Sequence, residues 1–254
     1  MRFSLSIDLS KRSSHLFRRQ ASAARALVSS TIGAVTAIAI PFEKRTLDNG
    51  LDVIVHEARQ VPIVAVNVWY HVGSKNERPG RTGFAHLFEH LMFEGSEHHN
   101  TGYFPPLQQA GALLNGSTNT DRTNYWEVVP TSAIDLALWM ESDRMGYLLP
   151  AVTAERFETQ RDVVLNERRQ NYENRPYGMA LMAITAALFP PHHPYHWMTI
   201  GDVDDLRAMQ LEDVQAFFRT YYHPANASLV IAGDIETARA FDLSEHYFGE
   251  IPAG

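Results

Sequence analysis

Five residues, His86-Leu87-Phe88-Glu89-His90, constrain this 254-residue chain more than any other segment. In an α-helix, residues four apart lie on one face, so the imidazoles of His86 and His90 can bind one metal ion. Glu89 lies beside them, where it can accept a proton from a water molecule on that metal. The order His-x-x-Glu-His is the inverted form of a known zinc-binding motif. The segment is therefore expected to be helical and to carry a metal site.

The residues around the motif favour such a helix. Apolar residues recur there at the helical spacing i, i+3, i+4 and i+7: Phe84, Leu87, Phe88 and Leu91. Gly95 can end the helix. This pattern places the two histidines and Glu89 along one edge of the apolar stripe. The alternative is a pair of ordinary histidines bonded to nearby carbonyl groups. The helical context favours the metal site.

A catalytic zinc site needs a third protein ligand, and Glu167 is the candidate. It lies three and four residues after Val164 and Val163, on the face that those residues and Phe157 predict to be apolar. An inward carboxylate needs a partner, either zinc or an arginine such as Arg161 or Arg168. Two histidines and one glutamate would leave zinc with a net charge near +1.

Short blocks along the chain carry a family resemblance. In order, they are Leu47-Asp48-Asn49-Gly50-Leu51, His86 to His90, Glu167, His193-Pro194-Tyr195, Gly201, Tyr221 to Ala227 and Val230 to Asp234. In these blocks the chain resembles the zinc peptidase family that includes pitrilysin, insulin-degrading enzyme and the mitochondrial processing peptidase. The resemblance runs from about Phe42 to Pro252 and corresponds to one domain of a usually two-domain peptidase.

This resemblance implies a zinc metalloendopeptidase that hydrolyses peptides. It makes His86, His90 and Glu167 the Zn²⁺ ligands and Glu89 the general base that activates the zinc-bound water. It also implies that Asn115 and Gly116 lie on an edge strand that receives the substrate backbone. For Asn115 the alternative is a turn residue before Gly116.

The chain departs from the family pattern at two positions. Gln160 replaces an acidic residue that many relatives carry seven positions before the distal ligand, which puts a supporting carboxylate there in doubt. Gly116 stands where relatives usually have alanine. Neither departure alters the ligand set. A non-catalytic structural or assembly subunit of the same fold is the alternative function, although such subunits typically lose ligands and this chain retains all of them.

Composition narrows the range of partners. A net charge of −7 argues against binding to nucleic acid. The absence of cysteine excludes disulfides and cysteine-ligated zinc. The longest apolar stretch, residues 26–40, is too short to predict an integral membrane span.

Residues 1–40 differ from the rest of the chain. Up to residue 25 this segment holds six basic residues against one acid, and residues 26–40 carry no charge. The pattern predicts an export signal, with Ala37-Ile38-Ala39 as a cleavage site, and hence a periplasmic or secreted protein; a transit peptide to the mitochondrial matrix is the alternative. Residues 41–254 are expected to form a single zinc-peptidase domain.

The remaining pattern predicts an α+β fold in which a mixed, largely antiparallel sheet packs against helices. Asn49-Gly50 predicts a hairpin, and strands are expected at 63–72, 123–129 and 227–232. Helices are expected at 103–111, 132–145, 154–170, 177–189 and 211–221, the second of them opened by a capping box of Ser132 and Asp135. Because the family resemblance covers one domain of two, we expect a partner chain or a second copy to supply the other half.

Overall fold

The computed structural model describes residues 39–254, of which Pro41–Gly254 form one compact unit. The predicted export signal lies outside the described residues, apart from its last two positions. Among the described residues, no helix is long and apolar enough to cross a membrane.

The centre of the unit is a six-stranded sheet in the order β1-β2-β6-β3-β5-β4. Four of its five strand pairs are antiparallel, and the exception is the parallel pair of β2 and β6. The strands are β1 Glu43–Thr46, β2 Asp52–Glu57, β3 Ile63–Tyr70, β4 Leu113–Thr118, β5 Thr123–Pro130 and β6 Ala227–Gly233. The predicted mixed, largely antiparallel sheet is confirmed.

Local chemistry at Asn49 and Gly50 explains the hairpin of β1 and β2. Gly50 has φ +88°, a conformation that favours glycine, and the Asn49 side-chain oxygen accepts a bond from Leu51 N at 3.2 Å. The Asn49 amide also donates to the carbonyls of Phe248 (2.7 Å) and Ile251 (3.0 Å). The turn therefore fastens the first strands to the last residues of the chain.

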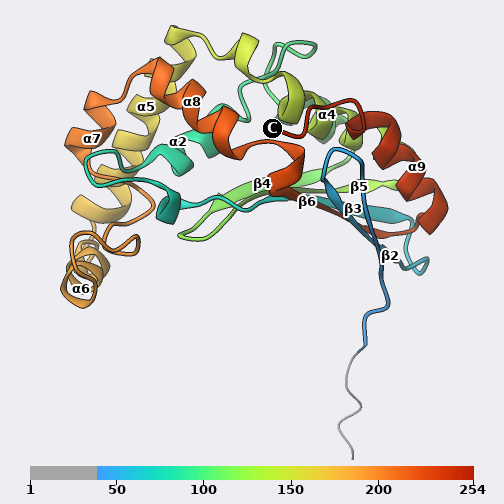
Figure 1. Ribbon diagram of the computed structural model, residues 1–254, viewed down its shortest axis with the longest axis horizontal. Coiled ribbons are helices and arrows are strands. Elements are labelled where there is room, and N and C mark those ends of the chain that lie inside the picture. Colours follow the sequence, from blue (N-terminus) through green and yellow to red (C-terminus); the bar gives the residue numbers. More distant parts are fainter. Residues whose placement is uncertain (1–38) are drawn as a thin grey trace, which may run out of the picture. The chain divides into compact units, whose positions relative to one another are not determined.

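One face of the sheet is buried under helices. Along β3 the inward residues Val64, Val66 and Val68 are buried, whereas Ile63 and Trp69 on the other face are exposed. Helices α4 (Ile134–Tyr147) and α9 (Thr237–Phe248) cover this face and pack against each other (Figure 1). Helix α3 (Phe104–Gln109) contacts β4 at the sheet edge.

A second group of helices lies beside the sheet (Figure 1). Helix α2 (Phe84–Leu91) contacts β4, α5 and α8, and α5 also contacts α7. The other helices of the group are α5 (Ala154–Arg168), α6 (Ala180–Leu188), α7 (Val203–Ala208) and α8 (Leu211–Tyr221). The group thus brings α2 between the edge strand β4 and α5.

Several expectations need correction. The capping box is wrong: α4 begins at Ile134 after Ala133, without a side-chain cap. Val163 is 37% exposed rather than buried, and Leu165 is buried instead. Helices α7 and α9 were not predicted, and α5 ends at Arg168 in a π-helical turn, Arg169–Glu173.

Candidate metal centre

Helix α2 presents its polar edge next to the sheet. Gly83, with φ +93°, precedes the helix, and the apolar residues of α2 are buried. The rings of His86 and His90 lie next to each other with centroids 4.9 Å apart. The predicted i, i+4 arrangement of the two imidazoles is therefore present in the structure.

Glu167, on α5, reaches both histidines. Its Oε2 atom lies 3.6 Å from His86 Nε2 and 3.6 Å from His90 Nε2. Among the described residues, these three side chains form the group whose ligand atoms are close enough to share an ion. Tetrahedral zinc with bonds of about 2.0–2.2 Å separates its ligands by about 3.3–3.6 Å, so the donor set fits zinc.

The alternative partners of Glu167 are occupied elsewhere. Arg168 donates to Glu173 and to the carbonyl of Gly201, and the Arg161 guanidinium lies over the Phe157 ring at 5.1 Å. The expected alternative, an arginine salt bridge to Glu167, is therefore not the arrangement in this structure.

The protonation states of α2 suit metal binding. Burial and the neighbouring His90 lower the pKa of His86 to about 4, so its imidazole is neutral and free to act as a ligand near pH 7. Burial raises the pKa of the Glu89 carboxyl, against the nearby Thr118 hydroxyl and the charge of His90, both of which lower it. A carboxylate with a raised pKa is a stronger base.

Gln160 supports His90, which the sequence did not reveal. The Gln160 side-chain oxygen lies 3.3 Å from His90 Nδ1, and the Gln160 amide donates to Glu94 Oε1 at 2.7 Å. With Nδ1 bonded in this way, Nε2 of His90 is left facing Glu167. Gln160 thus stands at the position where many relatives carry an acidic residue. Its place two helical turns before Glu167 is the feature of the sequence that could have indicated this contact.

Asn115 lies within strand β4, opposite Trp126 of β5, so the alternative of a turn residue is wrong. Within residues 39–254, strand β4 pairs only with β5 and forms an edge of the sheet. At Gly116 an added Cβ would lie 3.1 Å from the rings of Phe93 and Tyr125, which leaves little space for alanine.

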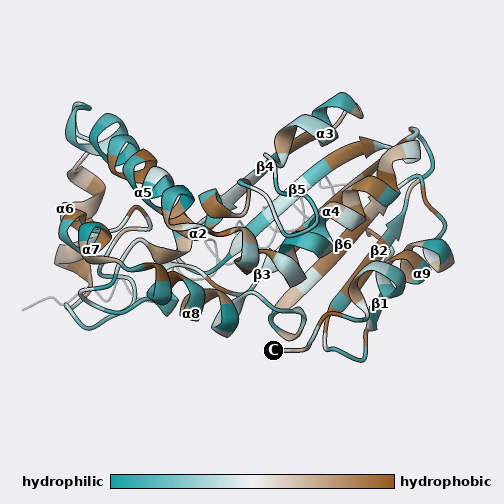
Figure 2. Ribbon diagram, turned by 90° about the horizontal axis from the view of Figure 1, so that it is seen from above, coloured by the Kyte–Doolittle hydropathy of each residue, from teal (hydrophilic) through white to brown (hydrophobic). Residues whose placement is uncertain are grey.

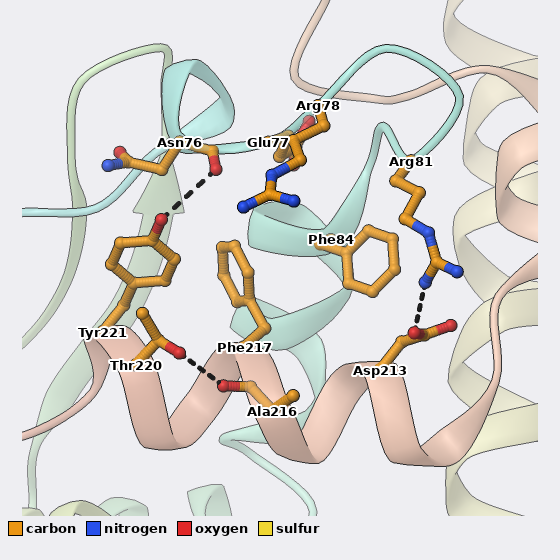
Figure 3. Close-up of a pocket in the computed structure, with 10 residues that line it drawn as sticks. All are labelled: Asn76, Glu77, Arg78, Arg81, Phe84, Asp213, Ala216, Phe217, Thr220 and Tyr221. Atoms are coloured by element: carbon orange, nitrogen blue, oxygen red, sulfur yellow. Dashed lines mark hydrogen bonds and ion pairs between the residues drawn. The ribbon is translucent and has the colours of Figure 1, made fainter.

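A pocket of about 420 Å³ lies elsewhere, between α8 and the segment that leads into α2 (Figure 3). The groups around it bond to one another: Asp213 pairs with Arg81, and Tyr221 donates to the Asn76 carbonyl at 3.4 Å. Glu77, which also lines the pocket, accepts bonds from Gly83 N (3.0 Å) and Ala85 N (2.9 Å) and so caps α2. The contacts around this pocket join α8 to the segment that leads into α2. His86 and His90 do not line it.

Comparisons with known proteins identify the family of the chain. The family described as Insulinase (Peptidase family M16) matches residues 52–194, and the description Peptidase M16 inactive domain matches residues 208–254. The zinc protease PqqE of Helicobacter pylori is 35% identical over 208 residues, covering 81% of this chain and 46% of that protein. The mitochondrial-processing peptidase subunit beta of Caenorhabditis elegans is 25% identical over 82% of this chain and 45% of its own length.

A solved structure shows the same fold. The crystal structure of a protease from Helicobacter pylori has a TM-score of 0.80 and 32% identity, covering 84% of this chain and 51% of that one. The chain thus spans about half the length of the curated relatives it matches. The match over more than half of its residues shows that this chain belongs to the insulinase family of peptidases, family M16.

Proposed function

We propose that this chain is the catalytic half of a zinc metalloendopeptidase in which His86, His90 and Glu167 bind zinc and Glu89 is the general base. The observation that carries the proposal is the position of Glu167 on α5. Its Oε2 atom lies 3.6 Å from the Nε2 atoms of both histidines, which are on α2. The names of the relatives support the metal, because PqqE is called a zinc protease.

The residues would divide the chemistry of peptide hydrolysis between them. When bound, zinc lowers the pKa of a water molecule and polarises the scissile carbonyl. Glu89 accepts the proton of the attacking water and returns it to the amide nitrogen as the C–N bond breaks. Gln160 keeps His90 oriented throughout, since it holds Nδ1.

Strand β4 would bind the substrate. It lies beside α2, and none of the described strands pairs with its outer edge, so an extended peptide can add to the sheet there by backbone hydrogen bonds. Asn115 and Gly116 occupy the middle of this strand. Backbone recognition of this kind gives affinity that depends little on peptide sequence.

The experiment that tests the mechanism is Glu89→Gln. We expect peptide hydrolysis to fall by about 10²-fold to 10⁴-fold while zinc binding is kept, because the amide cannot accept the proton. Glu158→Gln, at an exposed position of α5, is the matched control. Undiminished turnover in Glu89→Gln would refute the assigned role.

The alternative, a structural or assembly subunit, is favoured by one observation: residues 208–254 match the inactive domain of the family. Zinc content separates the two functions. A catalytic chain is expected to bind one zinc per molecule and to lose it in His86→Ala, whereas a structural subunit has no need of stoichiometric metal.

We also propose that the protein is exported, on the charge pattern of residues 1–40 alone. Fusion of this segment to a reporter that is active only after export tests the proposal. Reporter activity equal to that of a fusion without the segment would contradict it.

A further inference from the structure

The position of Glu167 depends on the end of α5. Glu167 is the next-to-last residue of the helix, just before the wider π-helical turn Arg169–Glu173. Its side chain is 37% exposed, so packing restrains it only in part. Its approach to the histidines therefore also depends on the backbone of this last turn.

The next residue, Arg168, is buried and holds that turn at two points. Its Nε donates to Glu173 Oε1 at 3.1 Å, across the π-helical turn. Its Nη1 donates to the main-chain carbonyl of Gly201. Arg168 therefore connects the end of α5 to a loop more than thirty residues further along the chain.

That loop also contacts the beginning of α2. Gly201 has φ +77°, and a Cβ added to it would lie 2.5 Å from the Cα of Gly83, the residue that precedes α2. Asp202 N donates to Thr82 Oγ1 at 2.8 Å. The Thr82 hydroxyl in turn donates to Asp205 Oδ2 at 2.7 Å, on α7. Backbone contact and hydrogen bonds thus join the loop to the helix that carries His86 and His90.

We infer that Arg168 is a positioning residue for the metal centre: through the Gly201 carbonyl it fixes the last turn of α5 against the first turn of α2, and so sets Glu167 relative to the two histidines. The inference rests on the proposed function, because it takes Glu167 as a ligand. Arginine suits this role, since its planar guanidinium donates in two directions at once and a lysine cannot reproduce both bonds.

The test is zinc affinity, measured by competition with a chelator on the full chain. We expect Arg168→Ala to weaken zinc binding by about 10-fold to 100-fold, as the loss of supporting bonds around a ligand does elsewhere. Arg168→Lys should weaken it less. The matched control is Arg169→Ala, which removes an exposed arginine whose side chain donates to Asn166 (2.9 Å) and should keep the affinity of the unchanged protein.

A double-mutant cycle separates positioning from a general structural role. In Glu167→Gln the ligand is gone, so adding Arg168→Ala should cost no further zinc affinity. Thermal unfolding of the metal-free variants shows whether each is folded, and Arg168→Lys replaces Arg168→Ala in the cycle if the alanine variant is not.

The outcomes distinguish this inference from the proposed function. If Glu167→Gln keeps the original zinc affinity, the ligand set is wrong and both fall. If Glu167→Gln weakens binding but Arg168 variants do not, or if the two effects add in full, the ligand set stands and the positioning role of Arg168 is refuted.

Discussion

Gln160 shows how a neutral residue can do the work of an acid beside a metal. It bonds His90 at Nδ1 and is itself bonded to Glu94, so the imidazole has one orientation. We expect Gln160→Leu to weaken zinc binding by about 10-fold to 100-fold, since His90 would lose this partner. Chelator competition measures it, with Glu158→Leu on the exposed face of α5 as the control. Equal affinities in the two variants would contradict the role.

Glu77 gives a prediction about pH. Burial raises its pKa from an ordinary value of 4.5 to about 8, although bonds from Ala85 N and Gly83 N favour the charged form. The folded protein therefore keeps this proton to higher pH than the unfolded chain. The resulting stabilisation is complete below about pH 4.5 and is lost as the pH rises through about 8.

The measurement is the free energy of unfolding by urea at several pH values, for the unchanged protein and for Glu77→Gln. The difference between the two should shrink as the pH rises from about 5 to about 8, because only the unchanged protein loses this proton. A difference that stays constant over this range would show that Glu77 is ionised in the fold throughout.

At this scale the sequence predicted the three candidate ligands but not their supporting residues. The candidate ligands His86 and His90, with the proposed general base Glu89 between them, form a local motif, and helical geometry alone places them together. Gln160 and Glu94 are 66 residues apart in the sequence, and Arg168 and Gly201 are 33 residues apart. Only the folded chain reveals these hydrogen bonds.

Among the elements, α4 carries a buried charge pair whose disruption should be costly. Arg144 is bonded to Glu141 one turn earlier, and its guanidinium lies 3.9 Å from the ring of Tyr103 and 4.2 Å from that of Tyr125. Arg144→Met would leave Glu141 buried without its cation. We expect a loss of about 3–5 kcal/mol in the free energy of unfolding.

The control for this prediction is Glu127→Gln, in the same cluster. Burial, reinforced by the charge of Glu141, raises the pKa of Glu127 well above its usual range, so its neutral acid is the form the fold favours. Glutamine has nearly the same shape, and we expect a loss below about 1 kcal/mol. Urea unfolding of both variants checks the pair. Similar losses would contradict this assignment of charges.

The elements that the sequence missed each have their own physical reason. Helix α9 begins after Glu236, whose side chain does not cap it; Glu57 of β2 accepts the bond from Thr237 N instead, at 3.1 Å. Its boundary is set by packing on β2 and α4. Helix α7 is only six residues long and gives little periodic signal. The capping box at Ser132 failed because a short 3₁₀ turn, Thr131–Ala133, replaces the expected first turn.

For the whole molecule, the fold class and the family could be predicted, because hydrophobic alternation and the ordered blocks both extend along the chain. The order of strands could not. Strand β2 pairs with β6, more than 170 residues away, and no local pattern encodes that neighbour. The same holds for the placement of α5 against α2, which creates the candidate metal centre.

Helix α6 suggests where the proposed second half would bind. It is composed of small and apolar residues, is drawn mainly in shades of brown in Figure 2, and has no buried residue. Its most exposed apolar side chains are Leu181 (53%), Ile184 (52%) and Leu188 (71%). Exposed apolar groups this close together are typical of an interaction surface. Because the relatives are about twice as long, we propose a second M16-type half as the occupant.

We therefore expect the purified chain to bind zinc but to cleave peptides slowly, since its metal centre and substrate strand are open to water. Adding the second half of the Helicobacter pylori relative as a separate chain should raise cleavage. In a variant with Leu181→Gln, Ile184→Gln and Leu188→Gln, zinc binding should persist, because these exposed side chains are not among the ligands, while the increase should be lost. Full activity from a demonstrably monomeric chain would refute the need for a partner. An unchanged increase in the triple variant would place the contact elsewhere than α6.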